Sequence, residues 1–346
     1  MKNFLSLWVF LAILTLNSYA QNSLKVLFVG NSYIYTNNLP QATADIAASC
    51  GDTLNFSSSA PGGCTFQQHL SNSTTLSLIA QGGWNFVILQ EQSQLPSFPI
   101  SQVENECFPY AQQLSQMIRE KGNEEVAFYM TWGRKNGDAS NCANYPPLCT
   151  YEGMDSLLYE RYTMMAEQNS AVISPVGRVW HYLRTHHPEI ELYSSDESHP
   201  SLTGTYAAAV TFYTILFRKS PLNASNLTLD ATTAAAIRHA AQTVVYDSLD
   251  FWYRFVETPN PIQENHSEFC VKIYPNPTSQ SLTIETTGEI AKEVAIYNEL
   301  GIAVTTLLTT NLPKIQIPIS HLPNGYYIAE IRSEKGISHQ KFVVAK

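Results

Sequence analysis

The chain has 346 residues, a length that favours two domains over one. Charged residues make up 14% of the chain and aromatic residues 11%, a composition that excludes an extensively disordered protein. The formal net charge is −9, from 20 basic and 29 acidic residues, and this acidic balance argues against a nucleic-acid partner.

Residues 1–20 have the pattern of a secretory signal peptide. Lys2 provides a positive charge, residues 4–16 are apolar, and Ser18-Tyr19-Ala20 is a small-x-small cleavage site. The apolar stretch is shorter than the ~20 residues that a transmembrane helix needs. We therefore expect export, cleavage after Ala20, and no stable insertion in a membrane.

Residues 24–218 alternate apolar runs typical of β-strands with helical stretches. Strands are expected at 25–29, 54–57, 84–89, 126–131 and 171–174, and helices at 39–48, 103–121, 154–168 and 202–218. This alternation predicts a five-stranded parallel sheet with helices on both faces. Such sheets bind ligands at the carboxyl ends of their strands, so we expect the chemistry in the loops that follow strands.

The first expected strand ends in Gly30-Asn31-Ser32. Gly30 permits a tight turn at the edge of the sheet. The helix that follows would point its N-terminal N–H groups back at Ser32, which favours a developing negative charge there. Ser32 is therefore a candidate nucleophile, although a serine that only caps a helix has the same pattern.

A second motif, Asp196-Glu197-Ser198-His199-Pro200, directly precedes the last expected helix. A serine nucleophile needs a base to accept its proton, and the base needs a carboxylate to fix its tautomer. Asp196 and His199, three residues apart in one loop, can supply both groups. Their order after Ser32 and the absence of a Gly-x-Ser-x-Gly turn differ from the α/β-hydrolase pattern.

These two motifs resemble the first and last sequence blocks of the SGNH (GDSL-like) hydrolases. Gly30-Asn31-Ser32-Tyr33, together with Asn38-Leu39-Pro40, is similar to an exported SGNH-like subfamily, and the resemblance covers roughly residues 24–220. It implies a three-layer α/β/α sandwich with a flavodoxin-like sheet. It also implies ester hydrolysis through an acyl-serine intermediate, with Ser32, Asp196 and His199 as catalytic residues and no metal or organic cofactor.

The same resemblance implies an oxyanion hole. Its donors would be the N–H of Ser32 and the N–H of Gly63 in Pro61-Gly62-Gly63-Cys64, with Gly62 as the alternative. The asparagine of the family's Gly-x-Asn-Asp block is missing, and Gln90-Glu91-Gln92-Ser93 stands in its place. This segment resembles sialate O-acetylesterase-like relatives, so we assign the third donor to Gln90, with Gln92 as the alternative.

Three side chains are candidates for substrate binding. Gln92 is one of them, and Trp132 follows the fourth expected strand, where it would stack on a sugar ring. His69 follows the Gly63 loop and would line the pocket. The alternatives are a packed tryptophan and an ordinary surface histidine.

The chain has six cysteines, and an exported protein can form disulfides. Cys142 and Cys149 flank a short Pro-Pro loop and are the best pair, while Cys50 and Cys64 are a second candidate pair. The sequence has no CxxC or HExxH motif, so it gives no support to a metal site.

Composition changes near residue 257, where Glu257-Thr258-Pro259-Asn260-Pro261 reads as a linker. We therefore divide the chain into a signal peptide (1–20), a catalytic domain (21–256), a linker (257–267) and a C-terminal domain (268–346). The last of these has short alternating runs at 271–274, 281–285, 293–297, 315–319, 326–331 and 340–344. They predict a small all-β sandwich.

The C-terminal motifs Tyr274-Pro275-Asn276-Pro277 and Leu322-Pro323-Asn324-Gly325-Tyr326-Tyr327 resemble the type A sorting domain of the type IX secretion system. The resemblance implies that the type IX machinery is a partner. It also implies passage through the periplasm and a final location in the medium or on the cell surface.

The sequence thus predicts a secreted serine esterase that acts on a small-molecule or carbohydrate ester, with acetyl esters of carbohydrates as candidate substrates. The alternative is a catalytically weak glycan-binding surface protein on the same scaffold, which the missing Gly-x-Asn-Asp block favours.

Overall fold

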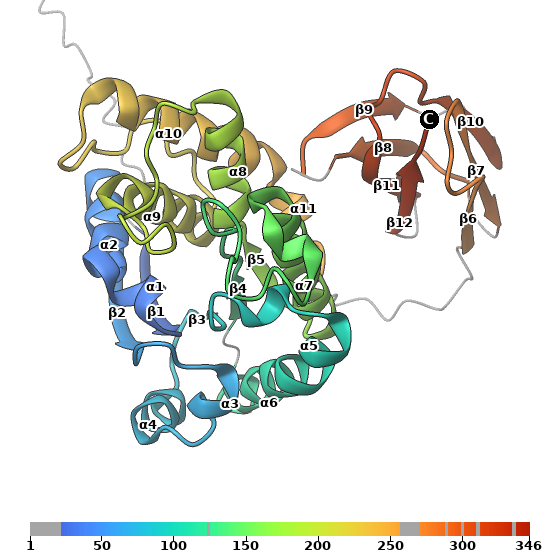
Figure 1. Ribbon diagram of the computed structural model, residues 1–346. Helices are drawn as coiled ribbons and strands as arrows, with labels where there is room; N and C mark the ends of the chain where they lie inside the picture. Colours follow the sequence, from blue (N-terminus) through green and yellow to red (C-terminus); the bar gives the residue numbers. More distant parts are fainter. Residues whose placement is uncertain are drawn as a thin grey trace, which may run out of the picture.

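A computed structural model describes residues 22–122, 125–256, 270–287, 290–298, 301–308, 312–333 and 337–346. The predicted signal peptide and the predicted linker lie outside these residues. Two bodies follow one another along the chain, an α/β domain and a smaller β domain (Figure 1). The domain limits given above remain predictions.

The α/β domain is built on a five-stranded sheet of order β2-β1-β3-β4-β5. Its strands are β1 (Ser23–Val29), β2 (Thr53–Ser59), β3 (Phe86–Leu89), β4 (Glu125–Tyr129) and β5 (Val172–Ser174). All neighbouring strands pair in parallel. The order is flavodoxin-like, with its reversal between β1 and β3, where such folds bind their ligands. The predicted fold is confirmed.

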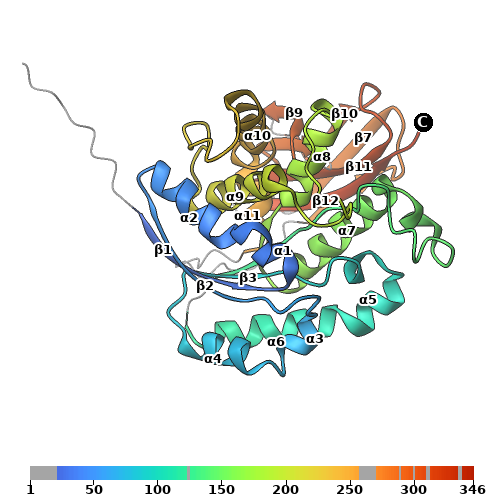
Figure 2. The ribbon, with the colours of Figure 1, turned by 60° about the vertical axis from the view of Figure 1, so that its left-hand side comes forward.

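Helices cover both faces of the sheet. In Figure 2, α2 (Leu39–Ser49) and α9 (Leu202–Phe217) lie on one face, and α4 (Ser73–Gln81) and α6 (Phe108–Arg119) lie on the other. The remaining helices are α1 (Ser32–Tyr35), α3 (Phe66–His69), α5 (Ile100–Glu106), α7 (Tyr151–Gln168), α8 (Val176–His186), α10 (Ala231–Val244) and α11 (Leu249–Tyr253). Because helices shield both faces, every side chain of β3 is buried, which explains its continuous apolar run.

Helix α9 shows how sequence composition matches position. Every residue from Gly204 to Phe217 is buried. The central alanines, Ala207, Ala208 and Ala209, let the helix lie close to its neighbours. A helix that is apolar all round belongs in the interior, and the packing of α9 against α2 and α8 explains the strong pattern of this segment.

The sequence missed three longer helices of the α/β domain, α4, α8 and α10, and the short helices α3 and α11. Helix α8 follows the three-residue strand β5 after a single residue, Pro175, so the strand pattern hides its start. Helix α10 lies beyond the segment in which strands and helices alternate. It has a clear start signal, because the side chain of Asp230 accepts a hydrogen bond from the N–H of Thr233 at 2.9 Å.

The C-terminal domain consists of two antiparallel sheets, of order β10-β7-β6 and β12-β11-β8-β9. Its strands are β6 (Cys270–Tyr274), β7 (Ser281–Thr287), β8 (Glu293–Tyr297), β9 (Ala303–Leu308), β10 (Lys314–Pro318), β11 (Gly325–Arg332) and β12 (Ile337–Val344). The two sheets share a separate core that includes Leu282, Ile296, Ile317, Ala329 and Phe342. The predicted all-β domain is confirmed, although β9 was not predicted.

The predicted disulfide between Cys142 and Cys149 is present. Cys142 and Cys149 are joined across the Pro146–Cys149 turn. Cys50 and Cys64, the other candidate pair, both carry free thiols. Cys50 ends α2 and Cys64 lies in the loop after β2, at opposite ends of that strand. In the part of the chain that the structure describes, no helix is long and apolar enough to cross a membrane.

Candidate active site

Ser32 lies at the carboxyl end of β1, where α1 begins. The chain passes very close to the loop after β3, because a Cβ on Gly30 would lie 2.5 Å from Gln90 Oε1 and 2.7 Å from Ile34 Cδ1. Only glycine fits at this position. The side chain of Asn31 accepts a hydrogen bond from the N–H of Tyr33 and caps α1, so Ser32 is free of the capping role.

Asp196 and His199 face Ser32 from the loop before α9. His199 Nε2 lies 2.8 Å from Ser32 Oγ, and His199 Nδ1 hydrogen bonds to Asp196 Oδ2. Because a carboxylate can only accept, Nδ1 carries the proton and Nε2 is left as the acceptor for the serine hydroxyl. The structure thus brings together the three side chains that the sequence singled out.

The loop that carries Asp196 is held by its own backbone. Asp196 Oδ1 accepts hydrogen bonds from the N–H groups of Ser198, at 3.0 Å, and His199, at 2.9 Å. Glu197 has a φ of 60°, which turns the chain tightly between the two functional residues. Partial burial opposes ionisation of Asp196, but the hydrogen bonds from the His199 ring and the two N–H groups lower its pKa below the usual value. Asp196 is therefore a stable carboxylate at neutral pH.

An aromatic stack supports this loop from the interior. Tyr33 and Trp132 are stacked with ring centroids 4.8 Å apart, and the Tyr33 hydroxyl hydrogen bonds to Ser198 Oγ at 2.7 Å. Trp132 Nε1 donates to the carbonyl of Ser198 at 3.1 Å. The Tyr33 ring also meets the His199 imidazole edge to face, with centroids 5.4 Å apart. These contacts fix the position of the loop that carries the base.

The predicted contact of Trp132 with a sugar is wrong. Its side chain is 0% exposed and lies between Tyr33 and Trp180, whose ring stacks on it with centroids 3.6 Å apart. A ring enclosed on both faces cannot stack on a substrate. Trp132 instead supports the loop of Asp196 and His199.

The predicted pocket-lining role of His69 is also wrong. His69 is fully buried, with Nε2 2.9 Å from the carbonyl oxygen of Gly30 and Nδ1 2.8 Å from Thr75 Oγ1. Since a carbonyl only accepts, Nε2 carries the proton. Burial lowers the pKa of His69, although the bond to Gly30 opposes this shift. His69 is a neutral donor that holds the turn beneath Ser32.

Two backbone N–H groups in the loops that follow β1 and β2 have no partner in the described part of the protein. Across the described ranges, neither the N–H of Ser32 nor that of Gly63 has a protein acceptor. Gly63 has a φ of +66°, which other residues rarely adopt, and no protein atom lies within 4 Å of the position of its absent Cβ. The loop after β2 is thus open at Gly63, as an oxyanion donor requires.

Gln90 cannot act as the third donor in this arrangement. Its side chain is completely buried, Oε1 accepts the N–H of Asn31 at 2.9 Å, and Nε2 donates to the carbonyl of Glu91. The prediction fails because Gly30 has no side chain, and Gln90 fills the space that it leaves.

Gln92 lies closer to solvent. Gln92 Oε1 accepts the N–H groups of Gln94, at 2.8 Å, and Leu95, at 3.0 Å, while Nε2 contacts Gln94 Oε1 at 3.2 Å. One of the two hydrogens on Nε2 therefore remains available to donate to another acceptor. Gln92 also lines a cavity of about 300 Å³ next to the Gly63 loop, together with Thr65, Gln67, Gln94 and Phe98.

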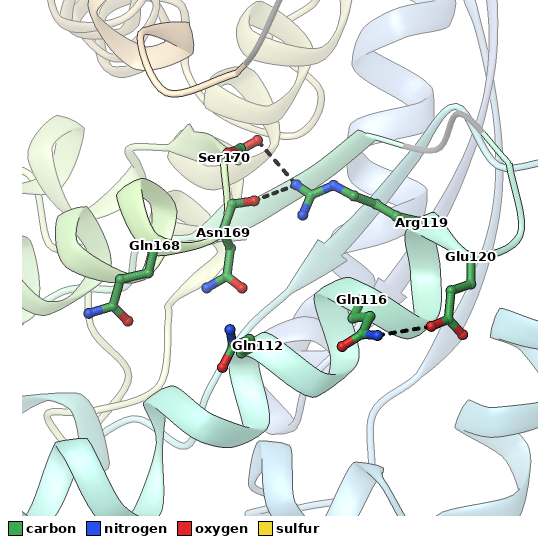
Figure 3. Close-up of a pocket in the computed structure, with 7 residues that line it drawn as sticks. All are labelled: Gln112, Gln116, Arg119, Glu120, Gln168, Asn169 and Ser170. Carbon is green, nitrogen blue, oxygen red and sulfur yellow. Dashed lines mark hydrogen bonds between the residues drawn. The ribbon is translucent and has the colours of Figure 1, made fainter.

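A second polar hollow, of about 430 Å³, lies away from Ser32 between the C-terminal ends of α6 and α7 (Figure 3). Its guanidinium group, on Arg119, is occupied, because it donates to the carbonyl oxygens of Asn169 and Ser170 and so caps α7. It therefore offers no free cation. Among the described residues, no group of three or more His, Cys, Asp or Glu side chains is arranged to hold a metal ion.

Residues 272–345 match the family model of the secretion system C-terminal sorting domain. The predicted sorting domain is confirmed, and it indicates type IX secretion to the medium or the cell surface. No curated protein matches the sequence of the chain.

The chain is similar to several solved structures. A DUF4886 family protein from Bacteroides uniformis has a TM-score of 0.55 and 19% identity, over 68% of this chain and 97% of that chain. A protein from Slackia heliotrinireducens, provisionally assigned to the SGNH hydrolases, has a TM-score of 0.47 and 23% identity over 56% and 98% of the two chains. The lipase/acylhydrolase from Enterococcus faecalis has a TM-score of 0.42 and 15% identity, over 57% of this chain and 97% of that chain. At 19% identity, the similarity to the Bacteroides uniformis protein shows a shared fold and nothing further.

Proposed function

We propose that the protein is an exported serine hydrolase of the SGNH type that cleaves carboxylic esters, with Ser32 as nucleophile. The observation that carries the proposal is the continuous hydrogen-bonded series from Ser32 Oγ to His199 Nε2, and from His199 Nδ1 to the Asp196 carboxylate. This arrangement of nucleophile, base and orienting carboxylate defines a serine hydrolase by its geometry on any fold.

The acylation step follows from this geometry. His199 Nε2 takes the proton of Ser32 Oγ while Oγ bonds to the ester carbonyl carbon, and the carbonyl oxygen becomes an oxyanion. The N–H groups of Ser32 and Gly63 would stabilise that charge. When the carbon–oxygen bond of the alcohol breaks, His199 returns its proton to the departing oxygen. A water molecule then repeats the sequence on the acyl-serine and releases the acid.

Asp196 does not exchange protons in this scheme. Its hydrogen bond to Nδ1 keeps the imidazole in the required tautomer and stabilises the imidazolium that forms during each step. Its lowered pKa supports this role, because the carboxylate stays ionised throughout the neutral range.

The third oxyanion donor is assigned to Gln92. We expect Gln92→Glu to lower kcat about a hundredfold or more with little change in KM, since it keeps the Oε1 acceptor, replaces the N–H donor by an oxygen and adds a negative charge beside the oxyanion. Gln90→Ala should instead destabilise the fold by about 1–3 kcal/mol, because the N–H of Asn31 loses its buried acceptor. The measurements are steady-state kinetics and urea unfolding of both variants.

The opposite pattern would return the donor role to Gln90: a large loss of kcat in a stable Gln90→Ala protein, with an unaffected Gln92→Glu. If neither variant loses kcat, two backbone donors suffice.

The substrate class proposed is an acetyl ester of a carbohydrate. In support, the cavity beside Gln92 combines the amides of Gln67, Gln92 and Gln94 with the Phe98 ring, a mixture that suits a hydroxyl-rich ligand with one apolar face. The decisive experiment is a screen of the chain from residue 21 onward against acetylated sugars and p-nitrophenyl esters of increasing acyl length. Acetyl preference with release of acetate supports the class, and preference for long acyl chains excludes it.

A glycan-binding protein without turnover is the second candidate. It is favoured by the glutamine-bearing segment that replaces the family's Gly-x-Asn-Asp block. Saturable glycan binding by a preparation that hydrolyses no activated ester would support this candidate.

A further inference from the structure

Glu91 is a completely buried carboxyl group next to the proposed oxyanion hole. Oε1 accepts the N–H of Phe66 at 3.1 Å and the N–H of Gln92 at 2.6 Å, and Oε2 lies 3.2 Å from the same Phe66 nitrogen. In the described part of the chain, no lysine, arginine or histidine pairs with it. Burying a carboxyl group costs free energy, and here hydrogen bonds, chiefly from backbone N–H groups, offset that cost. We therefore expect the role of Glu91 to lie in these hydrogen bonds.

The two N–H groups belong to different loops. Phe66 begins α3, three residues after Gly63, and Gln92 lies in the loop after β3. One carboxyl oxygen therefore connects the loop that offers the Gly63 N–H to the loop that offers the Gln92 side chain.

Asn31 makes the matching connection from the nucleophile side. Its Nδ2 donates to the carbonyl of Cys64 at 3.1 Å and to the carbonyl of Glu91 at 3.4 Å. The loops after β1, β2 and β3 are thus tied together by two buried polar side chains, Asn31 and Glu91. A displacement of any one loop would break hydrogen bonds to the other two.

The charge of Glu91 also matters for an oxyanion site. Burial raises its pKa to about 8, although the N–H groups of Gln92 and Phe66 and the Cys107 thiol oppose the shift. The other titratable groups that face it are Cys64, from the loop after β2, and Tyr162, from α7. Below pH 8 the carboxyl is mostly neutral, so it can accept both N–H bonds without placing a negative charge beside the developing oxyanion.

From these contacts we infer that Glu91 is a positioning residue of the oxyanion hole, which sets the separation of the Gly63 and Gln92 loops. The inference rests on the proposed function. Glu91 touches neither substrate nor nucleophile and acts only through the two backbone N–H groups that it holds.

Two substitutions test this role. Glu91→Leu removes both acceptors at similar volume, and Glu91→Gln keeps an Oε1 that can accept both N–H groups but never ionises. We expect Glu91→Leu to lower kcat about ten- to a hundredfold with KM within about twofold, because a displaced donor acts on the transition state alone. Glu91→Gln should stay within about threefold of the wild type at pH 7. The matched control is Glu104→Leu, at an exposed glutamate of α5.

The second readout is the pH profile. Wild-type kcat should decline above about pH 8, as the Glu91 carboxylate forms beside the oxyanion, and Glu91→Gln should not show this decline. This comparison needs no apolar variant, so it stands even if Glu91→Leu fails to fold. A folded Glu91→Leu protein with wild-type kcat would overturn the inference, as would identical pH profiles of Glu91→Gln and the wild type.

The two proposals fail in different ways. If the wild-type chain turns over esters and the Glu91 variants behave as the control does, the positioning role fails and the esterase stands. If the wild type turns over no ester, the proposed function fails and this inference with it.

Discussion

Ser32→Ala is expected to lower kcat on any ester substrate by about four orders of magnitude or more, to the level of contaminating activity. The reason is that Ser32 Oγ is the only nucleophile 2.8 Å from His199 Nε2 in the described residues. Without it, the base has no proton to take and no acyl intermediate can form. The measurement is steady-state hydrolysis of a p-nitrophenyl ester, together with labelling by a fluorophosphonate probe.

The control for this variant is Ser77→Ala, at an exposed serine of α4. It should keep full activity and full labelling. Thermal unfolding of Ser32→Ala should match that of the wild type, because the residue has no capping role at α1. Substantial turnover by a purified, folded Ser32→Ala protein would refute the assignment of the nucleophile.

Removal of residues 262–346 is expected to abolish delivery to the medium and the cell surface while leaving hydrolysis intact. The sorting domain has its own core, around Leu282 and Phe342, separate from the core of the α/β domain. The truncated chain should accumulate in the periplasm. Fractionation of cells that produce either form, followed by an ester assay of each fraction, measures both effects.

The truncation should also lower the thermal stability of the α/β domain slightly, because the two domains are in contact. Phe251 of α11 meets Tyr297 of β8 with ring centroids 5.6 Å apart, so truncation uncovers part of an aromatic side chain. A small loss of thermal stability is therefore expected.

Normal surface levels of the truncated protein would contradict a sorting role for residues 262–346.

The strands and helices that could be predicted from the sequence are those in which burial requires a run or a stripe of apolar residues. Residues 26–29 of β1, all of β3 and residues 126–129 of β4 are apolar and buried because both faces of the sheet are covered, and these runs predict strands directly. Helix α8 was missed because its amphipathic pattern starts one residue after a three-residue strand, which is too little sequence to separate the two.

The residues of the candidate site also fall into a group that the sequence could predict and a group that it could not. Ser32, Asp196 and His199 were accessible to sequence reasoning because each motif is local and the strand order predicts where the motifs meet. Gln90, Trp132 and His69 were misassigned because position after a strand does not reveal whether a side chain points inward. For Gln90, the deciding factor is the space above Gly30, and for His69 it is the carbonyl of Gly30, which needs a buried donor. Neither can be inferred from the sequence.

The proposed catalytic groups come from opposite ends of the domain sequence, with Ser32 before β2 and His199 after β5. A backbone cut between residues 142 and 149 would therefore leave the nucleophile on one fragment and its base on the other. The Cys142–Cys149 bridge spans this interval, so the fragments would stay covalently joined. A protein nicked there by a protease should keep its activity in oxidising surroundings and separate into two inactive halves only when a reductant and a denaturant act together.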